Sequence, residues 1–346
     1  MKNIKIPFTG MRNIFSLALS SWLTFAAPAH AVPELPLTPQ QRAQAIEDIA
    51  TGFEKIYFLP EVGNAVARDL RLRLRRGDYE RIMASRELAG VLSKHIDQIC
   101  HDSHTEVAYF EDDQLAERKA LDPAVARQRE DARRARALAA NVDFAEPQRL
   151  EGNIALIRFD GFHPAAYAAP VAQRIMSGAA DADALILDLR QNGGGAPDLI
   201  PVIASYLFDG QPVHLYDQFS RHEGTHVQAW TDPAQPGKRF GGSKPVYILT
   251  SKETFSAAEN LAYTLQKLKR AKVVGERTPG GAHGAFGKPV TSHLVPMIAT
   301  KRTINAVTGS DWDRVGVIPD VAVAADEALA AALAQTRVDI ARRESR

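Results

Sequence analysis

A serine at the junction of a predicted strand and a predicted helix is the first residue whose position could do chemistry. The apolar, partly β-branched run Val246–Thr250 is typical of a strand, and alanines and leucines recur at helical spacing from Ser256 to Lys269. A hydroxyl at a helix N-terminus lies beside unpaired N–H groups and the positive end of the helix dipole, where an oxyanion formed during acyl transfer could be held. A serine that merely caps a helix occupies the same position, so this stretch alone leaves both functions open.

A nucleophilic serine needs a base within hydrogen-bonding reach and a third group that orients the base. In α/β-hydrolases glycines flank the serine, and an acid and then a histidine follow it in the chain. Here Thr254 and Ala258 flank Ser256, and no aspartate lies between Ser256 and either His283 or His293. The α/β-hydrolase pattern therefore does not fit.

A second motif, His222-Glu-Gly-Thr-His226, fits the His-Glu-x-x-His pattern of zinc peptidases. That chemistry requires both histidines on one face of a helix. Gly224 and Thr225 are poor helix residues and several prolines lie nearby, so the sequence favours a loop or a hairpin. A zinc metallopeptidase that uses His222, Glu223 and His226 remains one alternative function.

The elements that must position these residues begin with a helical N-terminal part. The run Thr38-Pro-Gln-Gln41 supplies an N-cap, a proline at the first helical position and a capping-box glutamine, which predicts a helix to about Tyr57. Further apolar patterns at helical spacing continue to about residue 100 and predict a small helical bundle. A strongly charged helix to about Ala140 then reads as an exposed connecting element.

From Asn153 onward, predicted strands alternate with predicted helices. Strands are expected over 154–159, 184–189, 246–250 and 271–275, and helices over 165–177, 197–207 and from Ser256. The second of these strands is a continuous apolar run, typical of a strand buried on both faces. The alternation predicts an α/β domain with a largely parallel sheet.

The first 31 residues have the pattern of a secretory signal. Three basic residues precede an apolar run from Ile14 to Ala27, and Ala29-His-Ala31 fits a signal-peptidase site, which predicts cleavage after Ala31 and export to the periplasm or the medium. Cleavage changes the formal net charge from +1 to −2, so nothing in the charge balance favours nucleic acid as a partner. The single cysteine, Cys100, cannot form an internal disulfide and is interpreted as a buried apolar residue, with a reactive thiol as the alternative.

Four ordered motifs resemble those of the tail-specific (C-terminal processing) serine peptidases, and the resemblance covers roughly residues 150–325. The motifs are Leu187-Asp-Leu-Arg-Gln-Asn-Gly-Gly-Gly195, Thr254-Phe-Ser-Ala-Ala-Glu259, Val274-Gly-Glu-Arg-Thr-Pro-Gly-Gly281 and Gly316-Val-Ile-Pro-Asp320. In the processing-peptidase branch the base is a lysine at the position of Gly281. The nearest downstream lysine, Lys288, does not match that motif, so a Ser-Lys dyad is not expected.

The tricorn-like and interphotoreceptor retinoid-binding branches resemble the chain more closely, because they share its Gly-Gly turn. In the tricorn-like enzymes the base comes from a Ser-His pair ahead of the core, which corresponds to Ser103-His104. An acid before the last motif completes a tetrad and corresponds to Asp313, although those enzymes have glutamate. The resemblance implies that Ser256 is the nucleophile and His104 the general base, with Ser103 and Asp313 orienting the imidazole.

The resemblance also implies an oxyanion hole, a fold and a function. The N–H groups of Gly194 or Gly195 and of Ala257 would form the oxyanion hole. The expected fold is α/β, with a crotonase-like core of ββα units and an N-terminal helical bundle. About 47 residues separate Thr105 from Gly152, too few for a PDZ domain.

We therefore expect an exported serine-type hydrolase, most simply a peptidase, that acts on a peptide or protein substrate without a metal or organic cofactor. A non-catalytic binding protein for apolar ligands or peptides on the same fold is the second alternative. The expected parts of the chain are a signal peptide (1–31), a helical domain (32–104), a charged connector (105–150), the α/β core (151–330) and a tail (331–346).

Overall fold

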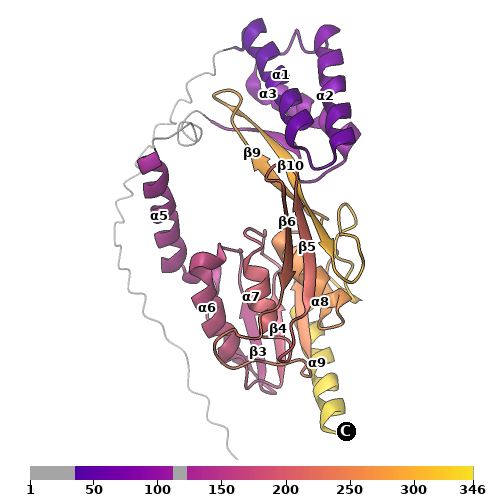
Figure 1. Ribbon diagram of the computed structural model, residues 1–346. Helices are drawn as coiled ribbons and strands as arrows, with labels where there is room; N and C mark the ends of the chain where they lie inside the picture. The colour runs from indigo at the N-terminus through magenta and orange to yellow at the C-terminus, as the bar shows by residue number, and fades with distance from the viewer. Residues whose placement is uncertain (1–35, 112–122, 346) are drawn as a thin grey trace, which may run out of the picture. The chain divides into compact units, whose positions relative to one another are not determined.

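The computed structural model describes residues 36–111 and 123–345, so the predicted signal peptide lies outside the described residues. Three helices come first: α1 (Pro39–Ile56), α2 (Pro60–Arg75) and α3 (Ser85–Cys100) (Figure 1). Thr38 and Gln41 form the predicted capping box at the start of α1. The three helices share one apolar core. None of the helices in the described ranges is long and apolar enough to cross a membrane.

The connecting segment contains β1 (Glu106–Tyr109), α5 (Pro123–Ala139) and the short 3-10 helix η1 (Asn141–Asp143). Helix α5 is the predicted charged helix, and Ala137 is its one buried residue over 124–139. Arginines and acids on the rest of its surface face solvent, which fits an exposed connector.

A six-stranded sheet forms the centre of the α/β part. Its order is β11 (Val321–Ala322), β8 (Lys272–Gly275), β7 (Val246–Thr250), β4 (Ala184–Asp188), β3 (Ile154–Arg158) and β2 (Gln148–Leu150). All neighbouring pairs are parallel except β2 and β3, so the predicted largely parallel sheet is confirmed.

Helices cover both faces of this sheet. On β4, Leu185 and Leu187 pack in the core formed with α6 (Ala165–Gly178), α7 (Leu199–Ser205) and α8 (Ala257–Lys267). The alternate residues Ala184 and Ile186 pack in the core that contains residues of α9 (Ala328–Glu344). Burial on both faces explains why β4 is a continuous apolar run.

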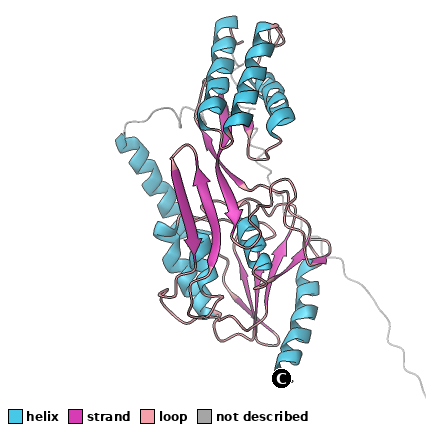
Figure 2. Ribbon diagram, turned by 45° about the vertical axis from the view of Figure 1, so that its right-hand side comes forward, coloured by secondary structure: helices cyan, strands magenta, loops and turns pink. Residues whose placement is uncertain are grey.

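A second, antiparallel sheet was not predicted. Its order is β1, β10 (Leu294–Asn305), β5 (His214–Ser220) and β6 (Thr225–Trp230), and β9 (His283–Gly287) also pairs with β10. Figure 2 shows its long strands reaching the three N-terminal helices. Because Leu294, Ile298 and Ala299 of β10 pack in the core of those helices, β10 ties the N-terminal part of the chain to the rest.

Candidate active site

Ser256 lies where the sequence predicted it, between β7 and α8. It immediately precedes the first residue of α8, and its backbone has φ 54° and ψ −114°. This is a conformation that residues with a side chain rarely adopt, at a cost of about 1–3 kcal/mol. Such strain persists only where the surroundings enforce it, and it is a feature of activated nucleophiles on tight strand–helix turns.

Two groups enforce the strained conformation. The Phe255 N–H donates to the carbonyl of Asn192 at 3.0 Å, and the Ser256 N–H donates to the carboxylate of Glu259 at 2.8 Å. Glu259 is fully buried and also accepts the hydroxyl of Thr278 and the N–H groups of the Gly280-Gly281 turn. Burial raises the pKa of Glu259, while these four donors lower it. One carboxylate therefore ties the serine turn to the turn at Gly281.

The glycine turn after β4 lies directly against Ser256. A Cβ on Gly194 would stand 2.8 Å from the Cβ of Ser256 and 3.0 Å from the nitrogen of Ala257, and Gly194 has φ 92°, so only glycine fits. The Gly194 N–H is engaged, because it donates to Oδ1 of Asn192 at 2.9 Å. Within the described residues, the N–H groups of Gly195 and Ala257 donate to no protein atom. Gly195 and Ala257, unlike Gly194, therefore have N–H groups that are available to a ligand.

His104 comes from the segment between α3 and β1, far from Ser256 in the sequence. Its ring stacks on Phe255, the residue before Ser256, with ring centroids 4.7 Å apart. Its buried Nδ1 has no hydrogen-bond partner. Burial lowers the pKa of His104 to about 4; the charge of Asp102 opposes this effect and that of His283 adds to it. The imidazole is therefore neutral at neutral pH and can accept a proton.

Gly281 explains why a lysine base has no place here. A Cβ at this position would lie 2.4 Å from the Phe255 ring and 2.5 Å from Cε1 of His104. The His104 ring thus fills the space that a side chain at position 281 would need.

Ser256 and His104 line the same cavity of about 370 Å³, together with the oxyanion candidates Gly195 and Ala257. The rest of the lining is mixed. Met297 and Trp312 are among its apolar residues, and Gln218, Lys301 and Thr303 are among its polar ones. The cavity is large enough for amino-acid side chains of a substrate.

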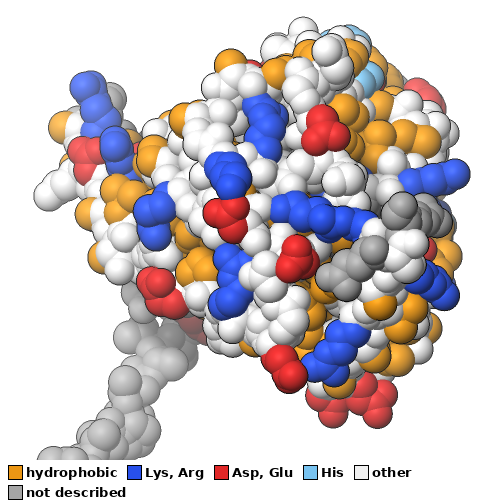
Figure 3. Space-filling view, turned by 90° about the horizontal axis from the view of Figure 1, so that it is seen from below, with side chains coloured by type: hydrophobic (Ala, Val, Ile, Leu, Met, Phe, Trp, Pro, Cys, Tyr) orange, Lys and Arg blue, Asp and Glu red, His pale blue; other side chains and the backbone are white. Residues whose placement is uncertain are grey.

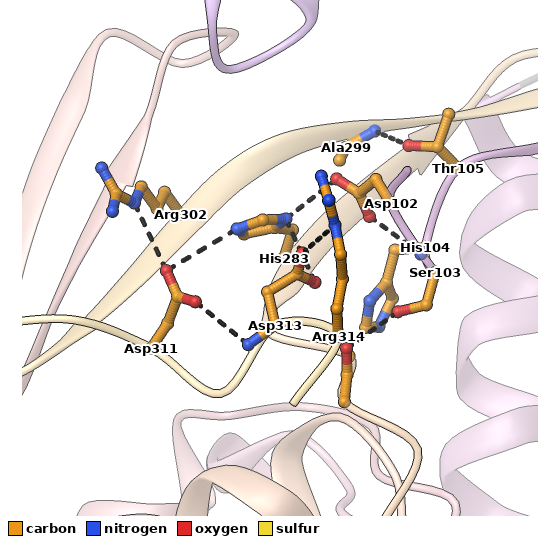
Figure 4. A network of polar contacts seen from close by, with 12 residues as sticks. Asp102, Ser103, His104, Thr105, His283, Ala299, Arg302, Asp311, Asp313 and Arg314 are labelled. Carbon is orange, nitrogen blue, oxygen red and sulfur yellow. Dashed lines mark hydrogen bonds and ion pairs between the residues drawn. The ribbon is translucent and has the colours of Figure 1, made fainter. Parts of the chain in front are cut away.

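The two orienting residues implied by the resemblance lie near His104 but make other contacts. The Ser103 hydroxyl donates to the carbonyl of Gly280 at 3.1 Å. Oδ1 of Asp313 lies 3.6 Å from Nδ1 of His283, and the same oxygen is buried without a hydrogen bond (Figure 4). Asp313 therefore faces His283, and no hydrogen bond joins it to His104 within the described residues.

The sequence reasoning missed the contact between Asp102 and His283. Nδ1 of His283 lies 2.8 Å from Oδ2 of Asp102, whose other oxygen accepts the His104 N–H at 2.9 Å. Asp102 could have been noticed beside Ser103-His104. No sequence pattern indicated that His283 contacts Asp102, because 181 positions separate the two residues.

The His-Glu-x-x-His motif lies in the turn between β5 and β6 and at the start of β6, not on a helix, as the sequence favoured. His226 bonds Asp217 at 2.8 Å, and Glu223 pairs with Lys301 at 2.9 Å. The ring of His222 packs instead on Phe286, with ring centroids 4.8 Å apart. The helical geometry of a zinc peptidase is therefore absent from this hairpin, which argues against the metallopeptidase alternative.

The thiol alternative is also disfavoured. Cys100 is buried, and burial raises the pKa of its thiol to about 11, so the thiolate needed for catalysis is scarce.

Comparison with known families separates the chain into two matched segments. Residues 153–323 match the model described as peptidase family S41, and residues 30–144 match the N-terminal domain of S41 peptidases in eukaryotic IRBP. The two segments are adjacent and together hold both Ser256 and His104.

Curated proteins that resemble the chain in sequence include two named as C-terminal processing peptidases. Over 141 residues the chain is 34% identical to the Arabidopsis thaliana chloroplastic carboxyl-terminal-processing peptidase 2, a match that covers 40% of this chain and 25% of that protein. The chain thus spans about a quarter of the length of the curated relatives it matches.

Two solved structures have a similar fold. A Parabacteroides merdae protein superposes with a TM-score of 0.57 at 17% identity, covering 87% of this chain and 97% of that one. The photosystem II D1 C-terminal processing protease gives 0.52 at 15% identity, covering 84% and 94%. At these identities the likeness concerns the mixed α/β fold.

Proposed function

The chain belongs to peptidase family S41, a family of serine peptidases, and we propose that it cleaves peptides or unfolded protein tails through an acyl-enzyme on Ser256. The observation that carries the proposal is the strained turn at Ser256, which lines one cavity with the His104 ring and with two unpaired N–H groups. Nucleophile, base and oxyanion donors are the parts that acyl transfer requires.

In the proposed reaction, an imidazole nitrogen of His104 takes the hydroxyl proton of Ser256 while Oγ attacks the scissile carbonyl. The N–H groups of Gly195 and Ala257 hold the oxyanion of the tetrahedral intermediate. When the C–N bond breaks, His104 returns the proton to the leaving amine. Water, deprotonated by the same imidazole, then hydrolyses the ester and restores Ser256.

Asp313 and Ser103 complete a tetrad-like site in this proposal. Nδ1 of His104 and Oδ1 of Asp313 each lack a hydrogen bond, and one bridging water or a small rotation joins them when substrate binds. Ser103 acts through the main chain, since its bond to Gly280 holds the His104 segment against the Gly281 turn.

The substrate class follows from the family and from the cavity. The described residues between Thr105 and Gly152 form only β1, α5, η1 and β2, which do not make up a PDZ domain, so we propose that the cavity itself recognises the substrate. Charged side chains of both signs are interspersed on the face seen in Figure 3, which gives no support for a nucleic-acid partner. By analogy with the names of its relatives, we propose that protein C-termini are substrates.

We further propose a crotonase-like core of ββα units over 151–330, preceded by a helical bundle, and export with cleavage after Ala31. Intact-mass analysis of the exported protein should give a chain that begins at Val32. A mass that retains residues 1–31 in the exported protein contradicts the cleavage.

A ligand-binding protein on the same fold is the second candidate. Residues 30–144 match the N-terminal domain found in eukaryotic IRBP, the interphotoreceptor retinoid-binding branch named above. Hydrolysis separates the two. Unfolded casein is incubated with the purified protein, with Ser256→Ala and with His104→Ala, each with and without EDTA. Cleavage lost in both variants and indifferent to EDTA supports the peptidase, whereas a folded wild type without cleavage supports the binding protein.

A further inference from the structure

His283, the first residue of β9, is a buried histidine that the proposed reaction does not use. It is 7% exposed, and its partner Asp102 is 2% exposed. Their contact of 2.8 Å between Nδ1 and Oδ2 joins the segment that carries His104 to the strand that follows Gly281 (Figure 4).

Asp102 links His283 to the main chain of the proposed base, His104. Its Oδ1 accepts the main-chain N–H of His104 at 2.9 Å, and its Oδ2 also accepts the hydroxyl of Tyr57 at 3.2 Å. The N–H of Thr105 closes the turn on the Asp102 carbonyl at 3.0 Å. Movement of the Asp102 carboxylate therefore moves the backbone of His104.

Charged groups from three segments surround the His283 ring. They are Asp102 before β1, Arg302 on β10, and Asp311, Asp313 and Arg314 after β10. On its flat side the ring packs on Phe58, with centroids 4.3 Å apart. The adjacent Tyr57 stays neutral, because burial raises the pKa of its hydroxyl.

The surrounding carboxylates decide the charge of His283. Burial by itself lowers the pKa of the ring, but the hydrogen bond to Asp102 and the negative charges of Asp102, Asp311 and Asp313 outweigh it and raise the pKa to about 9. At neutral pH the ring is a cation among three carboxylates.

Asp102, His283 and Asp313 also lie close enough to one another to hold a metal ion. Two ligands of a tetrahedral Zn²⁺ ion, each at about 2.0–2.1 Å, stand roughly 3.3 Å apart. The separation of 2.8 Å between His283 and Asp102 is instead that of a charge-assisted hydrogen bond, so a proton occupies this contact.

We propose that His283 is a positioning residue: its cationic ring fixes Asp102, and Asp102 fixes the main chain of His104 so that the base reaches Ser256. The inference rests on the proposed function of Ser256 and His104. His283 touches neither the transferred proton nor the acyl group in this account, and it acts through Asp102.

The test compares the wild type with His283→Gln, which keeps an N–H donor but loses the charge. With a fluorophosphonate–rhodamine probe, the maximal labelling rate should fall about 10- to 100-fold, because small displacements of a catalytic group have effects of that size. The probe's half-saturating concentration should change less than about twofold, since ground-state binding is retained. His226→Gln, which breaks the histidine–aspartate pair with Asp217, is the matched control and should label as the wild type does.

The pH profile separates positioning from a merely structural role. The wild-type rate should decline as pH rises through about 9, when His283 loses its proton, and His283→Gln should show no decline in that range. The inference is overturned if His283→Gln is labelled at the wild-type rate. It is also overturned if that variant keeps the alkaline decline in rate.

A readout independent of activity guards against misfolding of the variant. Histidine-detected NMR of the full chain should show His283 titrating near pH 9, and Asp102→Asn should lower that midpoint. Amide exchange at His104 should be faster in His283→Gln. Three results would each contradict the inference. They are titration of His283 at or below pH 6.5, unchanged amide exchange at His104, and zinc that the wild type binds but the His283 variant does not.

The outcomes also separate this inference from the proposed function. Labelling retained in Ser256→Ala defeats the proposed function, and amide exchange at His104 then still decides whether His283 positions that segment. Labelling lost in Ser256→Ala but normal in His283→Gln defeats this inference alone.

Discussion

Burial of the His104 ring controls when it can act as a base. Its pKa is lowered from 6.5 to about 4, so the ring stays neutral at pH values where an ordinary histidine is protonated. We expect the acid limb of fluorophosphonate labelling to lie near pH 4. The ring of His104 stays unprotonated in the folded chain at pH values where the unfolded chain binds a proton there. The contribution of His104 to stability is therefore present above about pH 6.5 and is lost as pH falls towards 4.

The measurement is the labelling rate from pH 3.5 to 8, with circular dichroism at each pH as the control for folding. An acid limb between pH 6 and 7 in a folded protein contradicts the burial of His104.

Because Gly281 has no side chain, it leaves room for the His104 ring. A Cβ in Gly281→Ala would stand 2.5 Å from Cε1 of His104, so the ring must leave its present position. We expect labelling to slow about 10- to 100-fold and stability to fall by about 1–3 kcal/mol. Gly210→Ala is the control, because nothing lies within 4 Å of its added Cβ. A Gly281→Ala protein that labels at the wild-type rate contradicts this geometry.

Ser256 and His104 could be proposed from the sequence because each lies in a short local motif that resembles a motif of the family. The pairing of Asp102 with His283 could not be predicted, since it depends on how β9 folds back against the segment after α3. The contacts of Asp313 differ from expectation for a related reason. The cation at position 283 competes for its carboxylate.

The start of α8 is held by Glu259, which accepts four donors between 2.6 and 2.9 Å. Glu259→Gln would turn an NH₂ group towards donors, so we expect a loss of about 2–4 kcal/mol in the free energy of unfolding and loss of labelling. Urea denaturation measures the first effect. Glu253→Gln, an exposed change in the same loop, should alter neither, and equal effects of the two substitutions would be inconsistent with the role of Glu259.

Helices and parallel strands could be predicted from local patterns, and the antiparallel sheet could not. Strand β7 matches the predicted range, and α6 begins at the predicted residue. Strand β9 is His-Gly-Ala-Phe-Gly, whose glycines weaken any strand signal. It becomes a strand through its pairing with β10, a tertiary interaction that no short window of sequence reveals.

The proposed base and nucleophile come from distant parts of the chain, so the N-terminal helices and the α/β part must be ordered together. Residues from Pro36 onward form one compact unit, and β10 contributes to the core of the helices while pairing with β5. We therefore expect a single cooperative unfolding transition. Far-UV circular dichroism and tryptophan fluorescence, to which the buried Trp312 contributes, should give coincident urea midpoints. Two separated midpoints would show that the parts unfold independently.

The central claim is that Ser256 is a nucleophile activated by His104. The most direct measurement is the site and rate of fluorophosphonate modification, mapped by mass spectrometry of tryptic peptides. The account predicts one adduct, on Ser256 in the peptide from Glu253 to Lys267, and a rate reduced about 10³-fold or more in His104→Ala. An adduct on another residue, or an unchanged rate in His104→Ala, would contradict it.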